Sequence, residues 1–267
     1  MKRFAVCFLG LALACATVAR AEDSLDVEEQ QIGAKVSTEL QSKGEIIPRG
    51  NPLYDTLDPI AARIASVADP QYDFPFHFYL VHESQPNAFA VPGGNVYVTD
   101  SLMHFVQNQE ELAGVLCHET SHDIHHDVVH NEVKDERTGE VIGFVGWLTG
   151  LGKTHVGQAG ERLVYALETN HFSREVEAAA DHKGALTCAQ AGYNPWGMVW
   201  LFENFEKADT GGRLEVLSDH PADRHRIRNL KKEFAADPAL FGAFSPDIAS
   251  ATALPGVTAT APGPPRR

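Results

Sequence analysis

His118-Glu119-Thr120-Ser121-His122 ends a run of helix-forming residues that begins at Gln109 and contains no proline. Residues four apart on an α-helix lie on one face, one turn above the other. His118 and His122 can therefore offer two imidazole nitrogens to a single ion. Glu119 lies next to that ion without having to bind it. Two neutral imidazoles beside a carboxylate are typical of a site where zinc activates a water molecule.

A third protein ligand is needed, because catalytic zinc usually takes three protein ligands and leaves one position to water. The segment that begins at Ser173 predicts a second helix, with Ser173 as N-cap and alanines that propagate it. Glu177 and Asp181 lie four apart on this helix. We expect Glu177 to complete a His-His-Glu set and Asp181 to accept the free ring N–H of a ligand histidine. The alternative is that Glu175, Glu177 and Asp181 bind no metal and only form an exposed acidic face of this helix.

These segments, with one further strand-turn-strand segment, resemble the gluzincin metallopeptidases grouped with the CAAX prenyl proteases, in their periplasmic bacterial branch. The resemblance spans roughly Val27 to Phe234. It rests on four motifs in order along the chain: Asn87 to Gly94 followed by Val96 to Thr99; His118, Glu119 and His122; Ser173, Arg174, Glu177, Ala180 and Asp181; and His220, Pro221, Arg226 and Ile227.

The resemblance implies a zincin-like metallopeptidase domain with one Zn²⁺ per chain, bound by His118, His122 and Glu177. It implies that Glu119 is the general base. It also makes His220 a candidate fourth zinc ligand that holds the enzyme latent, and Arg226 a candidate oxyanion stabiliser. The alternatives are a simple helix cap for His220 and a surface ion pair for Arg226.

The chain departs from the family at the far end of the zinc motif. Relatives usually have an Arg-His pair there, whereas this chain has His126 and Asp127. The histidines at 118, 122, 126 and 130 also form a row at helical spacing, which a metal-buffering protein would use. His126 and His130 would lie about 6 and 12 Å beyond His122 on a continuous helix. We therefore interpret both as surface residues or a weak second site.

The remaining pattern predicts an α+β domain that is mostly helical, with a small β-sheet beside the active-site helix. Glu22 to Lys43 and Leu53 to Ala68 have apolar residues at helical spacing. Phe74 to His82, Asn87 to Val91 and Asn95 to Thr99 are predicted strands. Helical patterns dominate after them.

An exposed sheet edge in proteases of this class often binds substrate as an added strand, through backbone hydrogen bonds. The glycines of the turn would let a peptide approach closely. The alternative is an ordinary hairpin with a glycine-rich turn. The candidate substrate-binding residues are Asn87, Ala88, Phe89, Ala90, Pro92, Gly93 and Gly94.

The N-terminus predicts a signal peptide over residues 1–21, with a basic start, an apolar core from Phe4 to Val18 and a small-residue cleavage site ending at Ala21. The core is shorter than the roughly 20 residues of a membrane span. Cys15 fits a lipobox poorly, so lipid anchoring there is not expected. We expect a metallopeptidase domain over residues 22–244, a disordered Pro/Ala-rich tail over residues 245–267, and no appended helical-repeat domain.

The formal net charge is −14 at pH 7, and removal of the signal would make the chain more acidic. Such a chain will not hold a phosphate backbone, which excludes nucleic-acid binding. Cys117 and Cys188 would remain in a compartment that permits disulfides. Cys188 lies about 16 Å beyond Glu177 on a continuous helix, so we expect two buried thiols unless the helix breaks near Gly184.

Two segments lie in the sequence between the two helices that are predicted to bind the metal. Glu132 to Glu140 is hydrophilic and is expected to be a loop. Val141 to Leu151 is apolar and glycine-rich, and is interpreted as core, lid or a peripheral membrane contact.

The sequence and the resemblance together predict a periplasmic zinc endopeptidase that cleaves misfolded or unassembled envelope or outer-membrane proteins. The first alternative is a zinc-bound, mostly latent chaperone-like assembly factor gated by His220. The second is a periplasmic metal-binding protein that uses the histidine row.

Overall fold

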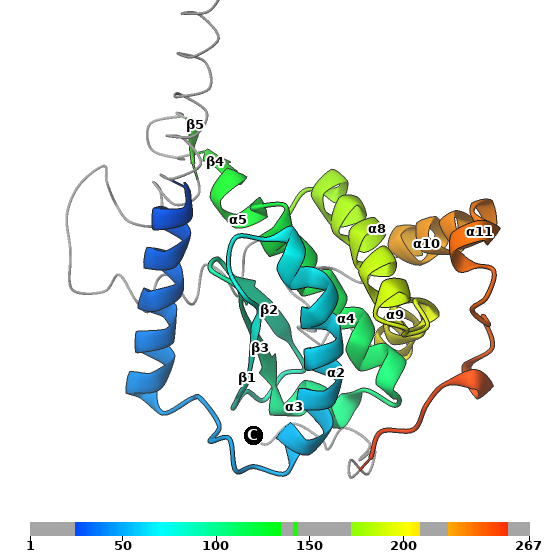
Figure 1. Ribbon diagram of the computed structural model, residues 1–267, viewed down its shortest axis with the longest axis horizontal. Coiled ribbons are helices and arrows are strands. Elements are labelled where there is room, and N and C mark those ends of the chain that lie inside the picture. The colour runs from blue at the N-terminus through cyan, green and yellow to red at the C-terminus, as the bar shows by residue number, and fades with distance from the viewer. Residues whose placement is uncertain (1–24, 135–140, 144–171, 209–223, 256–267) are drawn as a thin grey trace, which may run out of the picture.

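The computed structural model describes residues 25–134, 141–143, 172–208 and 224–255 (Figure 1). Several predictions lie outside these residues: the signal peptide with Cys15, most of the apolar segment from Val141 to Leu151, His220 with Pro221, and residues 256–267. The described chain is mostly helical with a small sheet, which confirms the predicted fold class. None of its helices combines the length and the apolar character that a membrane span requires.

The helices occupy most of the described chain. The first is helical over residues 25–43. The others are α2 (Leu53–Ala68), α3 (Asp100–Phe105), α4 (Gln109–Ile124), α5 (Asp127–His130), α8 (Arg174–Gln190), α9 (Trp196–Ala208), α10 (Arg224–Ala236) and α11 (Pro238–Phe241), with short 3₁₀ turns η1 (Asp69–Gln71) and η2 (Ile248–Ser250).

The three-stranded sheet has the order β1-β3-β2, from β1 (His77–Val81), β3 (Asn95–Thr99) and β2 (Ala88–Val91). β1 pairs with β3 in parallel, and β2 pairs with β3 in antiparallel register. β2 is therefore an edge strand. The turn between β2 and β3 needs its glycines, because Gly93 and Gly94 have φ of 95° and 83°, in the left-handed region.

The two faces of the sheet are covered by different helices (Figure 1). Val96 and Val98 point into the larger core with α2, α4 and α9. Tyr97, between them, points to the opposite face and packs in a second cluster with Ile32 and Leu40 of helix 25–43. This alternation follows from the two-residue period of a β-strand.

Helix α4 runs through the centre of the molecule, buried on all sides from Glu110 to Asp123. Its N-cap is Asn108, whose side chain accepts the backbone N–H of Glu111 at 2.8 Å. Helix α8 packs closely along α4 at Gly184, where an added Cβ would lie 3.1 Å from the His118 backbone nitrogen. Because Gly184 has no side chain, the two helices can approach closely, and this brings Glu177 of α8 near the histidines of α4.

The disulfide between Cys117 and Cys188 corrects the expectation of two thiols. α8 is unbroken through Gly184, as that expectation assumed. However, α8 runs antiparallel to α4, so it passes Cys117 on its way past the zinc motif. The Cα atoms are 5.8 Å apart, within the range of a disulfide. The expectation used the distance from Glu177 to Cys188 along α8. That distance does not limit the bond, because the disulfide joins α8 to the neighbouring helix α4.

α4 ends at Ile124, so His126 and His130 do not continue its face. His130 is exposed and His126 is half-buried, in line with their interpretation as surface residues. The expectation of a loop from Glu132 is wrong. Residues 132–134 are not loop but strand β4 (Glu132–Lys134), which pairs with β5 (Val141–Gly143).

The expected tail has defined structure up to residue 255. Thr252 donates its backbone N–H and its hydroxyl to the Glu110 carboxylate, both at 2.8 Å. The Trp200 indole donates to the Pro246 carbonyl at 3.1 Å. Composition suggested disorder, but these polar contacts satisfy the backbone of the segment and order it against α4 and α9.

Candidate metal centre

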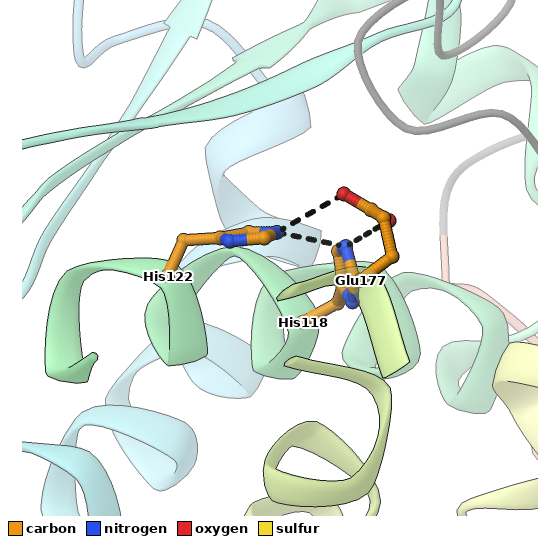
Figure 2. Close-up of side chains that lie close together, drawn as sticks. All are labelled: His118, His122 and Glu177. Atoms are coloured by element: carbon orange, nitrogen blue, oxygen red, sulfur yellow. Dashed lines mark hydrogen bonds and ion pairs between the residues drawn. The ribbon is translucent and has the colours of Figure 1, made fainter. Parts of the chain in front are cut away.

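Three buried donors from two helices converge on one point (Figure 2). His118 Nε2 and His122 Nε2 are 3.1 Å apart. Glu177 Oε2 lies 3.5 Å from His118 Nε2, and Glu177 Oε1 lies 3.7 Å from His122 Nε2. Donors about 2.1 Å from a tetrahedral ion stand about 3.4 Å from one another. The spacing of these three groups therefore fits a single zinc-sized ion.

The outer nitrogen of each imidazole faces a carboxylate. Asp181 Oδ1 lies 3.2 Å from His118 Nδ1, and Asp127 Oδ2 lies 2.8 Å from His122 Nδ1. These partners favour the proton on Nδ1 in both rings, which leaves each Nε2 with a lone pair. Two lone pairs 3.1 Å apart repel, so a proton or a cation must lie between the rings. This is the chemistry of a metal-binding pair.

Asp127 was not predicted, although it follows the zinc motif in the chain. The prediction gave Asp181 the task of holding a ligand imidazole, and the structure places Asp181 beside His118. The same task at His122 falls to Asp127, one of the two residues that depart from the family pattern. A continuous helix would point Asp127 away from His122, so only the observed end of α4 reveals this contact.

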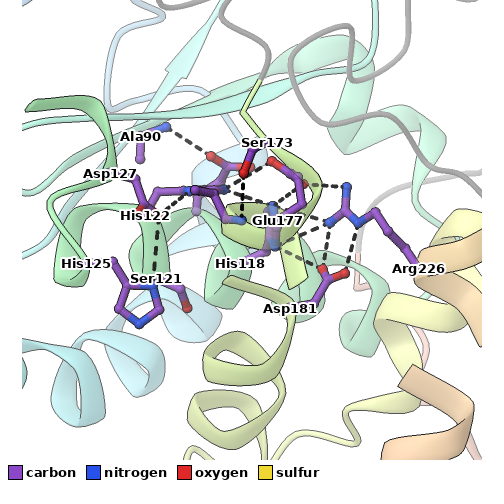
Figure 3. Close-up of polar contacts among 12 residues, drawn as sticks. Ala90, His118, Ser121, His122, His125, Asp127, Ser173, Glu177, Asp181 and Arg226 are labelled. Carbon is purple, nitrogen blue, oxygen red and sulfur yellow. Dashed lines mark hydrogen bonds and ion pairs between the residues drawn. The ribbon is translucent and has the colours of Figure 1, made fainter. Parts of the chain in front are cut away.

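Arg226 of α10 lies over the same group of side chains (Figure 3). Its Nε and Nη2 donate to Asp181 at 2.9 and 2.6 Å, and its Nη1 lies 2.8 Å from Glu177 Oε2. It is buried, and its guanidinium stacks on the Phe202 ring. The surface ion pair considered as an alternative is therefore wrong. The role of oxyanion stabiliser stays a prediction.

Ionisation at the centre follows from this packing. Burial and Arg226 act to lower the pKa of His118, but Asp181 and Glu177 outweigh them and raise it to about 9. Burial acts to raise the pKa of Asp181, yet Arg226 and His118 bring it down to about 2. Without a metal ion, a proton on His118 therefore takes the place between the two rings.

Glu119 lies beside the donors and is almost fully buried. Its Oε2 accepts the backbone N–H of Ala90 in β2 at 3.1 Å. Burial raises the pKa of Glu119 to about 7, against a lowering effect of His118. A carboxyl group with this pKa can both accept and release a proton near neutral pH.

The predicted substrate-binding residues divide into two groups. β2 is the edge strand beside α4, and its Ala90 donates its backbone N–H to Glu119. The turn faces inward instead: Gly93 donates to the Tyr72 hydroxyl at 2.9 Å and Gly94 to Asp123 at 3.2 Å. The glycines are explained by φ and by these internal contacts, not by space for a peptide.

An apolar pocket opens on the other side of Glu119 and His118, with an empty volume of about 240 Å³ that includes open solvent. Met198, Leu201 and Phe202 of α9 line it. The pocket thus places apolar side chains next to the candidate base.

Comparison with known proteins gives a family match over residues 54–234, to the model described as peptidase family M48. This range includes both ligand helices and β2.

Similar curated proteins include the mitochondrial metalloendopeptidase OMA1 of Schizosaccharomyces pombe, 26% identical over 218 residues, which cover 78% of this chain and 61% of that protein. OMA1 of Saccharomyces cerevisiae is 29% identical, covering 72% and 59%. The β-barrel assembly-enhancing protease of Escherichia coli K12 is 25% identical, covering 76% and 43%. The chain thus spans about half the length of these relatives.

Proposed function

Because this chain belongs to peptidase family M48, we propose that it is a zinc-dependent endopeptidase. The observation that carries the proposal is the convergence of His118, His122 and Glu177 within 3.1 to 3.7 Å of one another, with Glu119 beside them. The two imidazoles and one carboxylate suit zinc, which commonly takes this donor set in hydrolases.

Each residue has a part in the proposed reaction. A bound zinc ion would polarise a water molecule and the scissile carbonyl. Glu119 takes a proton from the attacking water and delivers it to the departing amine, which its raised pKa permits. Asp181 and Asp127 hold the two imidazoles in one tautomer. Arg226 balances the charge of Glu177 and Asp181, and we retain it as a candidate to stabilise the oxyanion.

Substrate is proposed to bind as an extended strand along β2, from Asn87 to Ala90. Backbone pairing requires little of the substrate sequence. This mode suits polypeptides that expose extended segments, such as misfolded or unassembled envelope proteins. The name of the Escherichia coli relative, a β-barrel assembly-enhancing protease, supports this class of substrate. The predicted signal peptide over residues 1–21 supports a periplasmic location.

Glu119→Gln tests the proposal. The variant keeps the shape of the side chain and all three donors, so it should bind zinc like the wild type and lose at least about 100-fold in casein cleavage. Glu175→Gln is the matched control, since Glu175 is exposed in the first turn of α8. Cleavage by Glu119→Gln at the rate of the control would refute the assignment of the base.

A further inference from the structure

His126 ends the active-site helix in an unusual backbone conformation. Its φ of 55° makes it the one non-glycine residue with positive φ among the described ranges. L-residues adopt this left-handed conformation at an energetic cost, so something must hold it.

The left-handed turn has a direct consequence for the metal centre. It separates the end of α4 from α5, which begins at Asp127. Asp127 thereby points back to His122, with 2.8 Å between Oδ2 and Nδ1. The orientation of one ligand imidazole thus depends on a turn outside the zinc motif.

Glu29, on helix 25–43, contacts the His126 side chain of this turn. Its Oε1 lies 2.8 Å from His126 Nδ1, and its Oε2 accepts the Tyr72 hydroxyl at 2.7 Å. Glu29 is only 1% exposed, although it lies on a helix with one face toward solvent. Burial of a carboxylate is unfavourable unless it is hydrogen-bonded, and here both oxygens are used. The same carboxylate reaches the β2–β3 turn through Tyr72, which accepts the N–H of Gly93.

We propose that Glu29 is a positioning residue of the metal centre, which acts through His126 and Asp127 to orient His122. Helix 25–43 precedes the range matched to the family, residues 54–234. The proposal thus gives a role at the metal centre to a helix that lies outside both the zinc motif and the matched range. The proposal rests on the proposed zinc site.

Zinc affinity of the full chain, measured by competition with a chromophoric chelator, tests this relay. Loss of a carboxylate that supports a ligand histidine typically weakens metal binding by about 10- to 100-fold, so Asp127→Asn should do so. Glu29→Gln should weaken binding in the same direction, by about 10-fold. The double variant should bind no more weakly than Asp127→Asn alone, because both changes break one path.

Leu40→Ala is the control for a merely structural effect. Leu40 is buried on the same helix, three turns after Glu29 and about 16 Å from it along the helix axis. It should lower the Tm of the metal-free chain and leave zinc affinity unchanged. His126→Ala supplies a second variant if Glu29→Gln fails to fold. Ala has no polar group to contact Glu29 and adopts the left-handed conformation at an energetic cost, so zinc affinity should fall as in Glu29→Gln.

Three results would overturn the relay while leaving the zinc site intact: wild-type affinity in Glu29→Gln, additive losses in the double variant, or equal weakening by Leu40→Ala. A wild-type chain that binds no zinc would instead overturn the proposed function itself.

Discussion

Cys117 and Cys188 form a disulfide that joins α4 to α8 one residue before His118. The two helices that supply the three candidate metal donors are thus covalently linked next to the candidate centre. The bond closes a separation of 71 residues in the sequence.

Removal of this disulfide should destabilise the protein. A chain-entropy estimate for a loop of this length is about 4 kcal/mol, and Cys117→Ala with Cys188→Ala should lose up to about that amount. The measurement is urea unfolding with and without a thiol reductant. The reductant should shift the wild-type midpoint and leave the double variant unchanged. A wild-type midpoint that ignores the reductant would show that the cysteines are not bonded.

Asp181→Asn should be strongly destabilising, because it removes the carboxylate charge that the buried Arg226 guanidinium and His118 share, and only Glu177 then remains to balance them. Breaking a buried ion pair costs about 3–5 kcal/mol. Asp58→Asn breaks the exposed pair with Arg49 and should cost no more than about 1 kcal/mol. Equal losses from the two variants in chemical unfolding would contradict the buried network.

Zinc affinity should depend on pH through His118. The raised pKa of about 9 means that the metal-free protein holds a proton where the ion binds. Binding must release that proton, so the apparent Kd should rise about tenfold for each pH unit below 9. Chelator competition at pH 7 to 9 measures this slope. An affinity that is flat over this range would show that His118 is already neutral in the metal-free protein.

Gly197→Ala tests the packing of α9 against the start of α4. A Cβ at this position would lie 2.0 Å from the Glu110 carbonyl oxygen, so the helices must separate. Overpacking of this kind costs about 1–3 kcal/mol or more. Gly50→Ala, where the added Cβ meets nothing within 4 Å, is the control. Thermal unfolding should separate the two, and a Gly197→Ala chain as stable as the control would argue against this contact.

The sequence predicted the elements that carry local signals. Helical spacing placed His118 and His122 on one face, the Ser173 cap began the second ligand helix, and the strands on either side of the glycine turn were predicted. The spacing of Glu177 and Asp181 also anticipated their positions beside the histidines, because α8 is regular there.

What the sequence did not predict depends on contacts between distant segments. The disulfide follows from the antiparallel approach of two helices at Gly184. Asp127 reaches His122 only because His126 adopts a left-handed conformation, which no local pattern indicated. The order of residues 245–255 depends on acceptors such as Glu110, more than one hundred residues earlier in the chain.

Metal content is the most direct test of the central claim, that His118, His122 and Glu177 together bind one ion. Inductively coupled plasma mass spectrometry of the purified full chain should find about one zinc per wild-type molecule. It should find almost none in His118→Ala or Glu177→Ala, and an unchanged amount in Glu175→Gln. Wild-type protein without metal, or Glu177→Ala protein that retains a full equivalent, would contradict the account.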